Sequence, residues 1–90
     1  MGPHMPKVEI YTQPYCPFCV RAVALLKNKG VAFEEIDARH GTPERETARV
    51  RSGGGTTVPQ IFIDDRAIGG CTELVALDRS GKLDPLLGLA

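Results

Sequence analysis

Two cysteines three residues apart, Cys16 and Cys19, enclose a proline and a phenylalanine. Residues at positions i and i+3 of a helix lie about 5–6 Å apart, which is within reach of a disulfide bond. If a helix begins here, Cys16 precedes its first turn, where free N–H groups and the positive end of the helix dipole lower the pKa of a thiol. Cys19 then lies one turn deeper. The spacing therefore predicts an exposed nucleophile, Cys16, and a shielded partner, Cys19, that resolves mixed disulfides.

A zinc site is the main alternative for two cysteines at this spacing. Tetrahedral zinc takes about four ligands, and beyond the pair the chain offers only Cys71, His40 and His4. A structural zinc site usually brings a second closely spaced pair, so we expect no metal. A purely structural disulfide is also disfavoured, because three cysteines form an odd, sparse set that fits a reducing compartment. We therefore expect a cytoplasmic protein.

Two further segments lie where backbone groups could meet a substrate. Pro59 stands at the start of an apolar strand, a position that tolerates a residue without an N–H. It could leave the backbone of Val58 open to pair with an extended thiol peptide, although an ordinary strand start explains the proline equally well. Gly69 and Gly70 precede a helix whose first N–H groups can bind a carboxylate. A simple turn before a helix remains the alternative.

The hydrophobic pattern predicts the elements that position these residues. In chain order they are strand Val8–Tyr11, helix Phe18–Lys29, strand Val31–Ile36, helix Pro43–Arg51, strand Gln60–Ile63, strand Arg66–Ile68, helix Thr72–Ser80 and a short turn at Leu83–Leu87. A strand–helix–strand unit requires parallel pairing, whereas the last two strands form an antiparallel hairpin. The expected fold is α/β: a four-stranded mixed sheet with helices on both faces, in the order βαβαββα, as in the thioredoxin fold.

Length and composition limit the remaining possibilities. Ninety residues provide one hydrophobic core, so we expect a single domain over residues 6–90, preceded by an expression-tag remnant at Met1–Met5. The formal net charge is zero, which gives the chain no overall attraction to nucleic acid or to an anionic membrane. No apolar run approaches the roughly 18 residues of a membrane span. We expect a monomer with no nucleic-acid or membrane partner.

Three motifs in this order resemble those of the glutaredoxin family, and the resemblance extends from Val8 to Leu87. The motifs are Cys16-Pro17-Phe18-Cys19, Thr57-Val58-Pro59 and Gly69-Gly70-Cys71-Thr72. The short bacterial dithiol members are the most similar. The resemblance implies a glutathione-dependent oxidoreductase that reduces protein disulfides and glutathione mixed disulfides, with glutathione as co-substrate.

The resemblance also implies a set of glutathione-binding residues. They are Gln13, Phe18, Arg51, Thr57, Val58, Pro59, Gly70, Cys71 and Thr72. Thr57 and Val58 would bind the cysteine moiety through their backbone, with Pro59 cis. Cys71 and Thr72 would receive the γ-glutamyl carboxylate at a helix start. Gln13 and Arg51 would meet the glycine carboxylate.

This chain departs from the family pattern in three places. Gln13 stands where many members have lysine, Phe18 replaces a tyrosine, and Thr72 replaces an aspartate that would face the glutathione amine. We expect weaker glutathione binding as a result. Cys71 is either a structural residue that opens a helix or an auxiliary redox thiol.

Two other functions remain open at this stage. One is a thioredoxin-like reductase that takes electrons from thioredoxin reductase, although the chain has no tryptophan beside its cysteines. The other is an iron–sulfur carrier in which Cys16 of two chains and two glutathiones hold a [2Fe–2S] cluster. Pro17 disfavours the second, because family members that hold a cluster usually have glycine or serine there.

Overall fold

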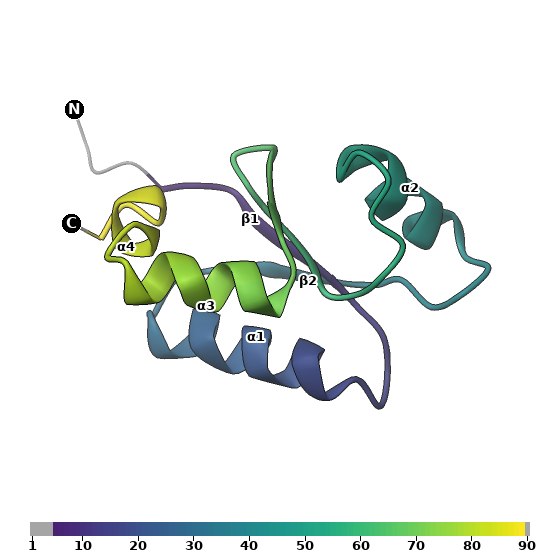
Figure 1. Cartoon of the computed structure of the whole chain (residues 1–90), viewed down its shortest axis with the longest axis horizontal. Helices are drawn as coiled ribbons and strands as arrows, with labels where there is room; N and C mark the ends of the chain where they lie inside the picture. The colour runs from purple at the N-terminus through teal and green to yellow at the C-terminus, as the bar shows by residue number, and fades with distance from the viewer. Residues whose placement is uncertain (1–4, 90) are drawn as a thin grey trace.

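The computed structural model describes residues 5–89, and of the predicted tag remnant Met1–Met5 only the exposed Met5 lies within that range. The elements are β1 (Val8–Thr12), α1 (Pro17–Asn28), β2 (Glu34–Asp37), α2 (Pro43–Arg51), β3 (Gln60–Ile63), β4 (Arg66–Gly69), α3 (Cys71–Arg79) and α4 (Leu83–Leu86). Their order is the predicted βαβαββα, and the short turn expected at Leu83–Leu87 is the short helix α4 (Figure 1).

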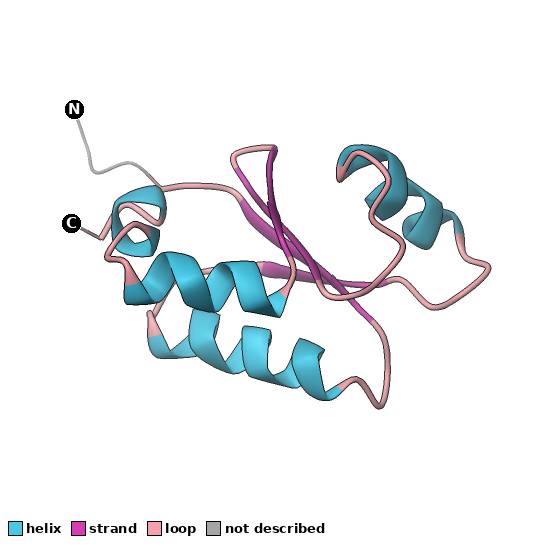
Figure 2. Ribbon diagram, in the orientation of Figure 1, coloured by secondary structure: helices cyan, strands magenta, loops and turns pink. Residues whose placement is uncertain are grey.

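The four strands form one mixed sheet in the order β2-β1-β3-β4. β1 pairs with β2 in parallel and with β3 in antiparallel, and β3 and β4 form an antiparallel hairpin. Helices α1 and α3 lie side by side against one face, whereas α2 lies on the other (Figure 2). The predicted α/β architecture, the thioredoxin fold, is therefore confirmed.

Successive side chains of the central strands point to opposite faces of the sheet, and this divides the hydrophobic core into two clusters. Val8 and Ile10 of β1 point towards α1 and α3, where they pack in a cluster with Leu26 and Leu74. Tyr11 points to the opposite face and packs in a second cluster, which contains Phe62, Ala38 and Ala48 of α2. The sheet is thus buried on both faces at its centre, which fixes the register of β1 and holds the loop after it in place.

Helix α1 begins and ends where the sequence predicts, to within a residue. Cys16 is its N-cap residue and Pro17 its first residue, a position where proline is favoured because its missing N–H needs no partner. Cys19, Ala22 and Leu26 are buried on one face. The chain leaves the helix through Gly30, whose φ of +71° is a conformation that glycine adopts without strain.

Helix α2 also forms as the sequence predicts. The hydroxyl of Thr42 accepts a hydrogen bond from the N–H of Arg45 at 3.2 Å, and Pro43 occupies the first turn. Only Ala48 is buried, so α2 is held to the sheet by a small apolar contact and by the arginines described below.

The second strand is shorter than predicted. Val31–Ile36 was expected as a strand, but β2 starts at Glu34, because its partner residues in β1 run from Glu9 to Thr12. Val31 and Phe33 pack against the core from a loop instead. The hydrophobicity of Val31 and Phe33 therefore indicates packing against the core and not strand pairing.

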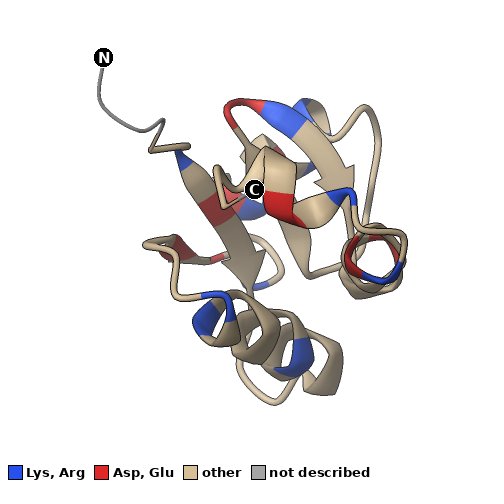
Figure 3. Ribbon diagram, turned by 90° about the vertical axis from the view of Figure 1, so that its left-hand side faces the viewer, with Lys and Arg blue, Asp and Glu red and all other residues tan. Residues whose placement is uncertain are grey.

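Charged residues of both signs are distributed over the surface, but α1 carries only basic ones. Arg21 and Lys27 are its charged residues, and the lowest helix in Figure 3 accordingly shows Lys and Arg without Asp or Glu. Within residues 5–89 no helix has the length and apolar character needed to cross a bilayer.

Candidate active site

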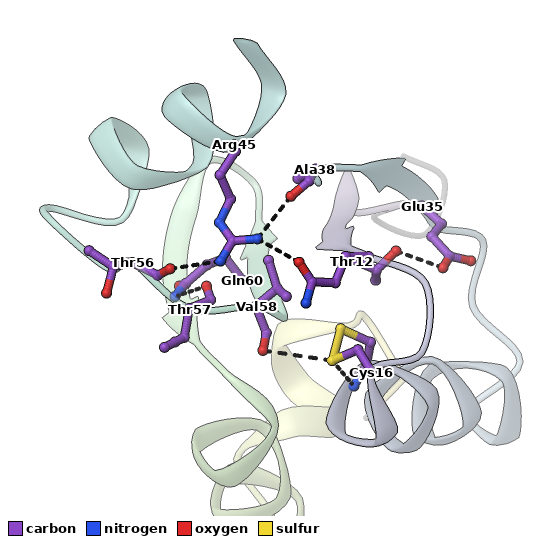
Figure 4. The surroundings of a disulfide bond; sticks show 11 residues. Thr12, Cys16, Glu35, Ala38, Arg45, Thr56, Thr57, Val58 and Gln60 are labelled. Atoms are coloured by element: carbon purple, nitrogen blue, oxygen red, sulfur yellow. Dashed lines mark hydrogen bonds between the residues drawn. A yellow bond between two sulfur atoms is a disulfide. The ribbon is translucent and has the colours of Figure 1, made fainter. Parts of the chain in front are cut away.

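Cys16 and Cys19 form a disulfide at the N-terminus of α1, with their Cα atoms 5.2 Å apart (Figure 4). The backbone of Cys16 is extended, and its sulfur accepts a hydrogen bond from the N–H of Cys19 at 3.2 Å. A sulfur that caps a helix receives both a backbone donor and the positive end of the helix dipole. The same contact would favour the thiolate of Cys16 once the disulfide is reduced.

The two cysteine residues differ less in exposure than the sequence predicts. Cys16 is 9% exposed and Cys19 3%, so the prediction of an exposed Cys16 is wrong for this disulfide form. Each sulfur shields the other, and the Cys16 sulfur also lies 3.9 Å from the carbonyl oxygen of Val58. Cys16 remains the more accessible of the two, since Cys19 faces the core with Ala22 and Leu26.

Most of the predicted binding residues line one groove of about 300 Å³, which we call the active-site groove. Its lining residues are Phe18, Thr57, Val58, Pro59, Gly70, Cys71, Thr72 and Glu73. They come from the start of α1, the loop before β3 and the start of α3, three segments far apart in the chain. Glu73 is the one lining residue that the sequence motifs do not indicate as a binding residue. A groove of this size is at the lower end of the range for small-molecule sites.

The loop before β3 offers an open backbone edge to this groove. The Val58–Pro59 peptide bond is cis, as the resemblance implies. The carbonyl of Thr57 accepts a hydrogen bond from Nε2 of Gln60 at 2.9 Å, which holds the loop (Figure 4). Within the part of the chain that the structure describes, the N–H of Val58 has no acceptor. An extended peptide could therefore pair with Val58.

The start of α3 closes the other side of the groove. A Cβ built on Gly70 would lie 3.3 Å from the carbonyl oxygen of Pro59, so only a residue without a side chain lets the two segments approach without displacement. The N–H of Gly70 donates to Oε1 of Glu73 at 2.7 Å. The N–H groups of the first helical turn have no intrahelical partner, and at Cys71 and Thr72 they are suited to bind an anion.

Cys71 is a free, buried cysteine, 6% exposed, at the first position of α3. Its burial agrees with a structural role. In the sequence, Cys71 and His40 were the remaining candidates for zinc ligands within the described residues. Among residues 5–89, no three His, Cys, Asp or Glu side chains come together in an arrangement that could hold a metal ion.

The structure brings Gln13 together with Arg45, not with Arg51. Oε1 of Gln13 accepts a hydrogen bond from Arg45, which also donates to the carbonyl oxygens of Ala38 and Thr56 at 3.0 and 2.9 Å (Figure 4). All three acceptors are neutral, so the positive charge of Arg45 stays available beside the loop before the cysteines. The sequence does contain an indication of where Arg45 lies, because Thr42 as the N-cap residue places Arg45 in the first turn of α2.

Arg51 is held by the sheet instead. Its guanidinium donates to both carboxylate oxygens of Glu9 and to the hydroxyl of Tyr11, and its Cζ lies 4.1 Å from the centroid of the Phe62 ring. It also donates to Asp65 at 3.1 Å. The hydrogen bonds that Arg51 donates to the Glu9 carboxylate raise the pKa of Arg51 above its usual value. With its donors engaged, Arg51 joins α2 to the sheet and does not line the active-site groove.

Comparisons with known proteins agree with this geometry. The family profile described as Glutaredoxin matches residues 8–68. The chain is 57% identical over 83 residues to Glutaredoxin 3 of Escherichia coli, covering 92% of this chain and 99% of that protein. The solution structure of glutaredoxin from Brucella melitensis superposes with a TM-score of 0.80 at 53% identity, covering 98% of this chain and 96% of that one. A crystal structure of a buckwheat glutaredoxin–glutathione complex superposes with a TM-score of 0.80 at 26% identity, covering 94% and 83%.

Proposed function

The chain belongs to the glutaredoxin family of thiol–disulfide oxidoreductases, and from this we propose that it works with glutathione, through Cys16 as nucleophile and Cys19 as resolving thiol. The observation that carries the proposal is the Cys16–Cys19 disulfide at the N-terminus of α1, with the Cys16 sulfur beside Val58 and the active-site groove. The buckwheat relative, by its description a complex with glutathione, supports the choice of reductant.

Reduction of a glutathione mixed disulfide needs only Cys16. Its thiolate attacks the glutathione sulfur, which forms a Cys16–glutathione disulfide and releases the substrate thiol. A second glutathione thiolate then attacks the glutathione sulfur of this intermediate. Glutathione disulfide leaves, and the Cys16 thiolate is regenerated.

Reduction of a protein disulfide needs both cysteines. The Cys16 thiolate attacks one substrate sulfur and displaces the other as a thiolate, which takes up a proton. The Cys19 thiolate then attacks Cys16, which releases the second substrate thiol and leaves the Cys16–Cys19 disulfide, the form seen here. Two glutathiones restore the dithiol and leave as glutathione disulfide. Cys19 is suited to this step because it lies one helical turn from Cys16, 5.2 Å between Cα atoms.

The proposed position of glutathione follows the lining of the active-site groove. Its cysteine moiety pairs with the backbone of Val58, and its γ-glutamyl carboxylate meets the N–H groups of Cys71 and Thr72. Its glycine carboxylate meets Gln13 and Arg45, which takes the role first expected of Arg51. Phe18 supplies an apolar wall without the hydroxyl of a tyrosine. Thr72 in place of an aspartate supports the proposal of weaker binding, because it leaves the amine of the γ-glutamyl group without the carboxylate that would face it.

We place this activity in a monomer, in the cytoplasm, with glutathione and disulfide-containing proteins as partners. The odd cysteine set and the burial of Cys71 agree with a reducing environment.

The test compares Cys16→Ser and Cys19→Ser on two substrates, with either glutathione and its reductase or thioredoxin reductase as electron source. We expect Cys16→Ser to lose all activity. Cys19→Ser keeps activity on a glutathione mixed disulfide and loses it on a protein disulfide. Cys71→Ser removes only the third thiol and keeps the backbone N–H that the carboxylate would meet, so it tests whether that thiol takes part in the reaction, and we expect it to retain both activities. Electron transfer from thioredoxin reductase alone would refute the glutathione dependence.

A further inference from the structure

A second groove runs beside the active-site groove, between α1 and α3. This α1–α3 groove has a volume of about 570 Å³ and is lined by Phe18 and Arg21 of α1 and by Val75, Ala76 and Arg79 of α3, among others. Phe18, Cys71 and Thr72 line both grooves, so the two are continuous. No step of the proposed reaction uses Arg21 or Arg79.

The charge of this groove is uncompensated. Within residues 5–89, neither Arg21 nor Arg79 makes an ion pair or a side-chain hydrogen bond, and no carboxylate lines the groove. The two carboxylates of α3 are engaged elsewhere: Glu73 accepts from the N–H of Gly70, and Asp78 pairs with Lys29 at 2.6 Å. Helix α1 contributes no acidic residue at all (Figure 3).

An apolar floor with two unpaired guanidinium groups is complementary to an acidic peptide. Val75 is half-buried and Phe18 is 55% exposed, so both can contact an incoming chain. Arginine binds carboxylates in a bidentate manner, and such pairs set the register of a bound peptide as well as its affinity.

We propose that the α1–α3 groove is the docking site for an acidic segment of protein substrates. This segment lies close in sequence to the substrate cysteine that Cys16 attacks. The proposal rests on the proposed function and specifies the substrate class of that site. Cys16 and Arg21 are five residues apart, which is about 7.5 Å along a helix, and Thr72 and Arg79 are about 10 Å apart. An extended chain advances about 3.3 Å per residue, so the preferred acidic residues lie about two to three positions from the attacked cysteine.

The test uses two peptides, each with an internal disulfide, that differ only in having two glutamates or two glutamines at those positions. At low ionic strength we expect the parent protein to reduce the acidic peptide about threefold to tenfold faster in kcat/KM, as two partly exposed ion pairs allow. Added salt should reduce this preference. The variant Arg21→Gln/Arg79→Gln should reduce both peptides at the rate of the glutamine peptide.

Arg66→Gln is the matched control, because Arg66 is an exposed arginine outside both grooves that makes no ion pair with the described residues. It should keep the full preference, and all variants should reduce the small mixed disulfide of glutathione and 2-mercaptoethanol at the parental rate. Equal rates for the two peptides, or a preference that survives in Arg21→Gln/Arg79→Gln, would overturn the docking site alone. A parent that reduces neither the peptides nor the small mixed disulfide would overturn the proposed function, and the docking site with it.

Discussion

Arg45 and Arg51 lie six residues apart on α2 and have different roles, which the substitution Arg51→Met distinguishes. The Arg51 side chain is 23% exposed, and that of its partner Glu9 is 13% exposed. Methionine keeps the unbranched apolar stem above Phe62 but removes every donor to Glu9 and Tyr11. The variant therefore leaves a mostly buried carboxylate without its cation.

The cost follows from the contacts that are lost. A hydrogen bond to a charged group contributes about 1.5–3 kcal/mol, and a cation over an aromatic ring adds about 0.5–1 kcal/mol. Because the pair is partly exposed, solvent screens it, and we do not expect the full penalty of a buried unpaired charge. We expect the free energy of unfolding to fall by about 2–4 kcal/mol, which lowers the Tm of a domain of this size by about 10–25 °C.

Urea denaturation followed by circular dichroism measures this loss, and the KM for glutathione measures the role in binding. Arg51→Met should leave KM unchanged in the folded protein, whereas Arg45→Met should raise it. The double variant Glu9→Leu/Arg51→Met should regain part of the lost stability, since it removes the unpaired carboxylate. A stability loss below about 0.5 kcal/mol, the range of ordinary surface substitutions, would refute the reasoning, as would a raised KM in Arg51→Met.

Three other changes test separate parts of the account. Thr72→Asp places a carboxylate where the resemblance puts the glutathione amine, so its KM for glutathione should fall severalfold, and an equal fall in Thr72→Asn would contradict that position. Thr42→Ala removes the hydroxyl that accepts from Arg45 N–H and should lower the unfolding free energy by about 1 kcal/mol in urea titrations, whereas unchanged stability would show that the cap is dispensable. The hydrogen bond from Lys7 lowers the pKa of the Asp65 carboxyl, so its stabilising effect is present above the unfolded pKa of about 4 and is lost as the pH falls through the folded pKa. Stability measured in this acid range should therefore fall more steeply in the parent than in Asp65→Asn, and parallel curves would argue against the contact.

The sequence alone predicts the sheet, its helices and most of the active-site groove. Local signals suffice where the backbone itself demands a residue type, as with Cys16 at the helix N-cap, Thr42 before α2 and Gly30 after α1. These positions depend on capping, proline and glycine preferences that act over a few residues. They are therefore visible without the tertiary structure.

The rest depends on packing between distant segments. Whether Arg45 or Arg51 reaches the active site is decided by how α2 lies across Tyr11 and Phe62, through contacts more than ten residues apart in the chain. The uncompensated charge of the α1–α3 groove likewise depends on tertiary contacts, because the two carboxylates of α3 bind the N–H of Gly70 and the amine of Lys29 and not the arginines of the groove. Periodicity assigns residues to faces of a helix but does not give their partners across the fold.

The central claim is that the helix N-terminus holds the Cys16 sulfur as an anion in the reduced protein. The direct measurement is the rate of alkylation of Cys16 by iodoacetamide against pH, in reduced Cys71→Ser, with the site of modification identified by mass spectrometry. The account predicts that this rate reaches its plateau at or below neutral pH and that Cys16 reacts well before Cys19. A rate that rises only near pH 8.5, as for a free cysteine in water, would contradict it.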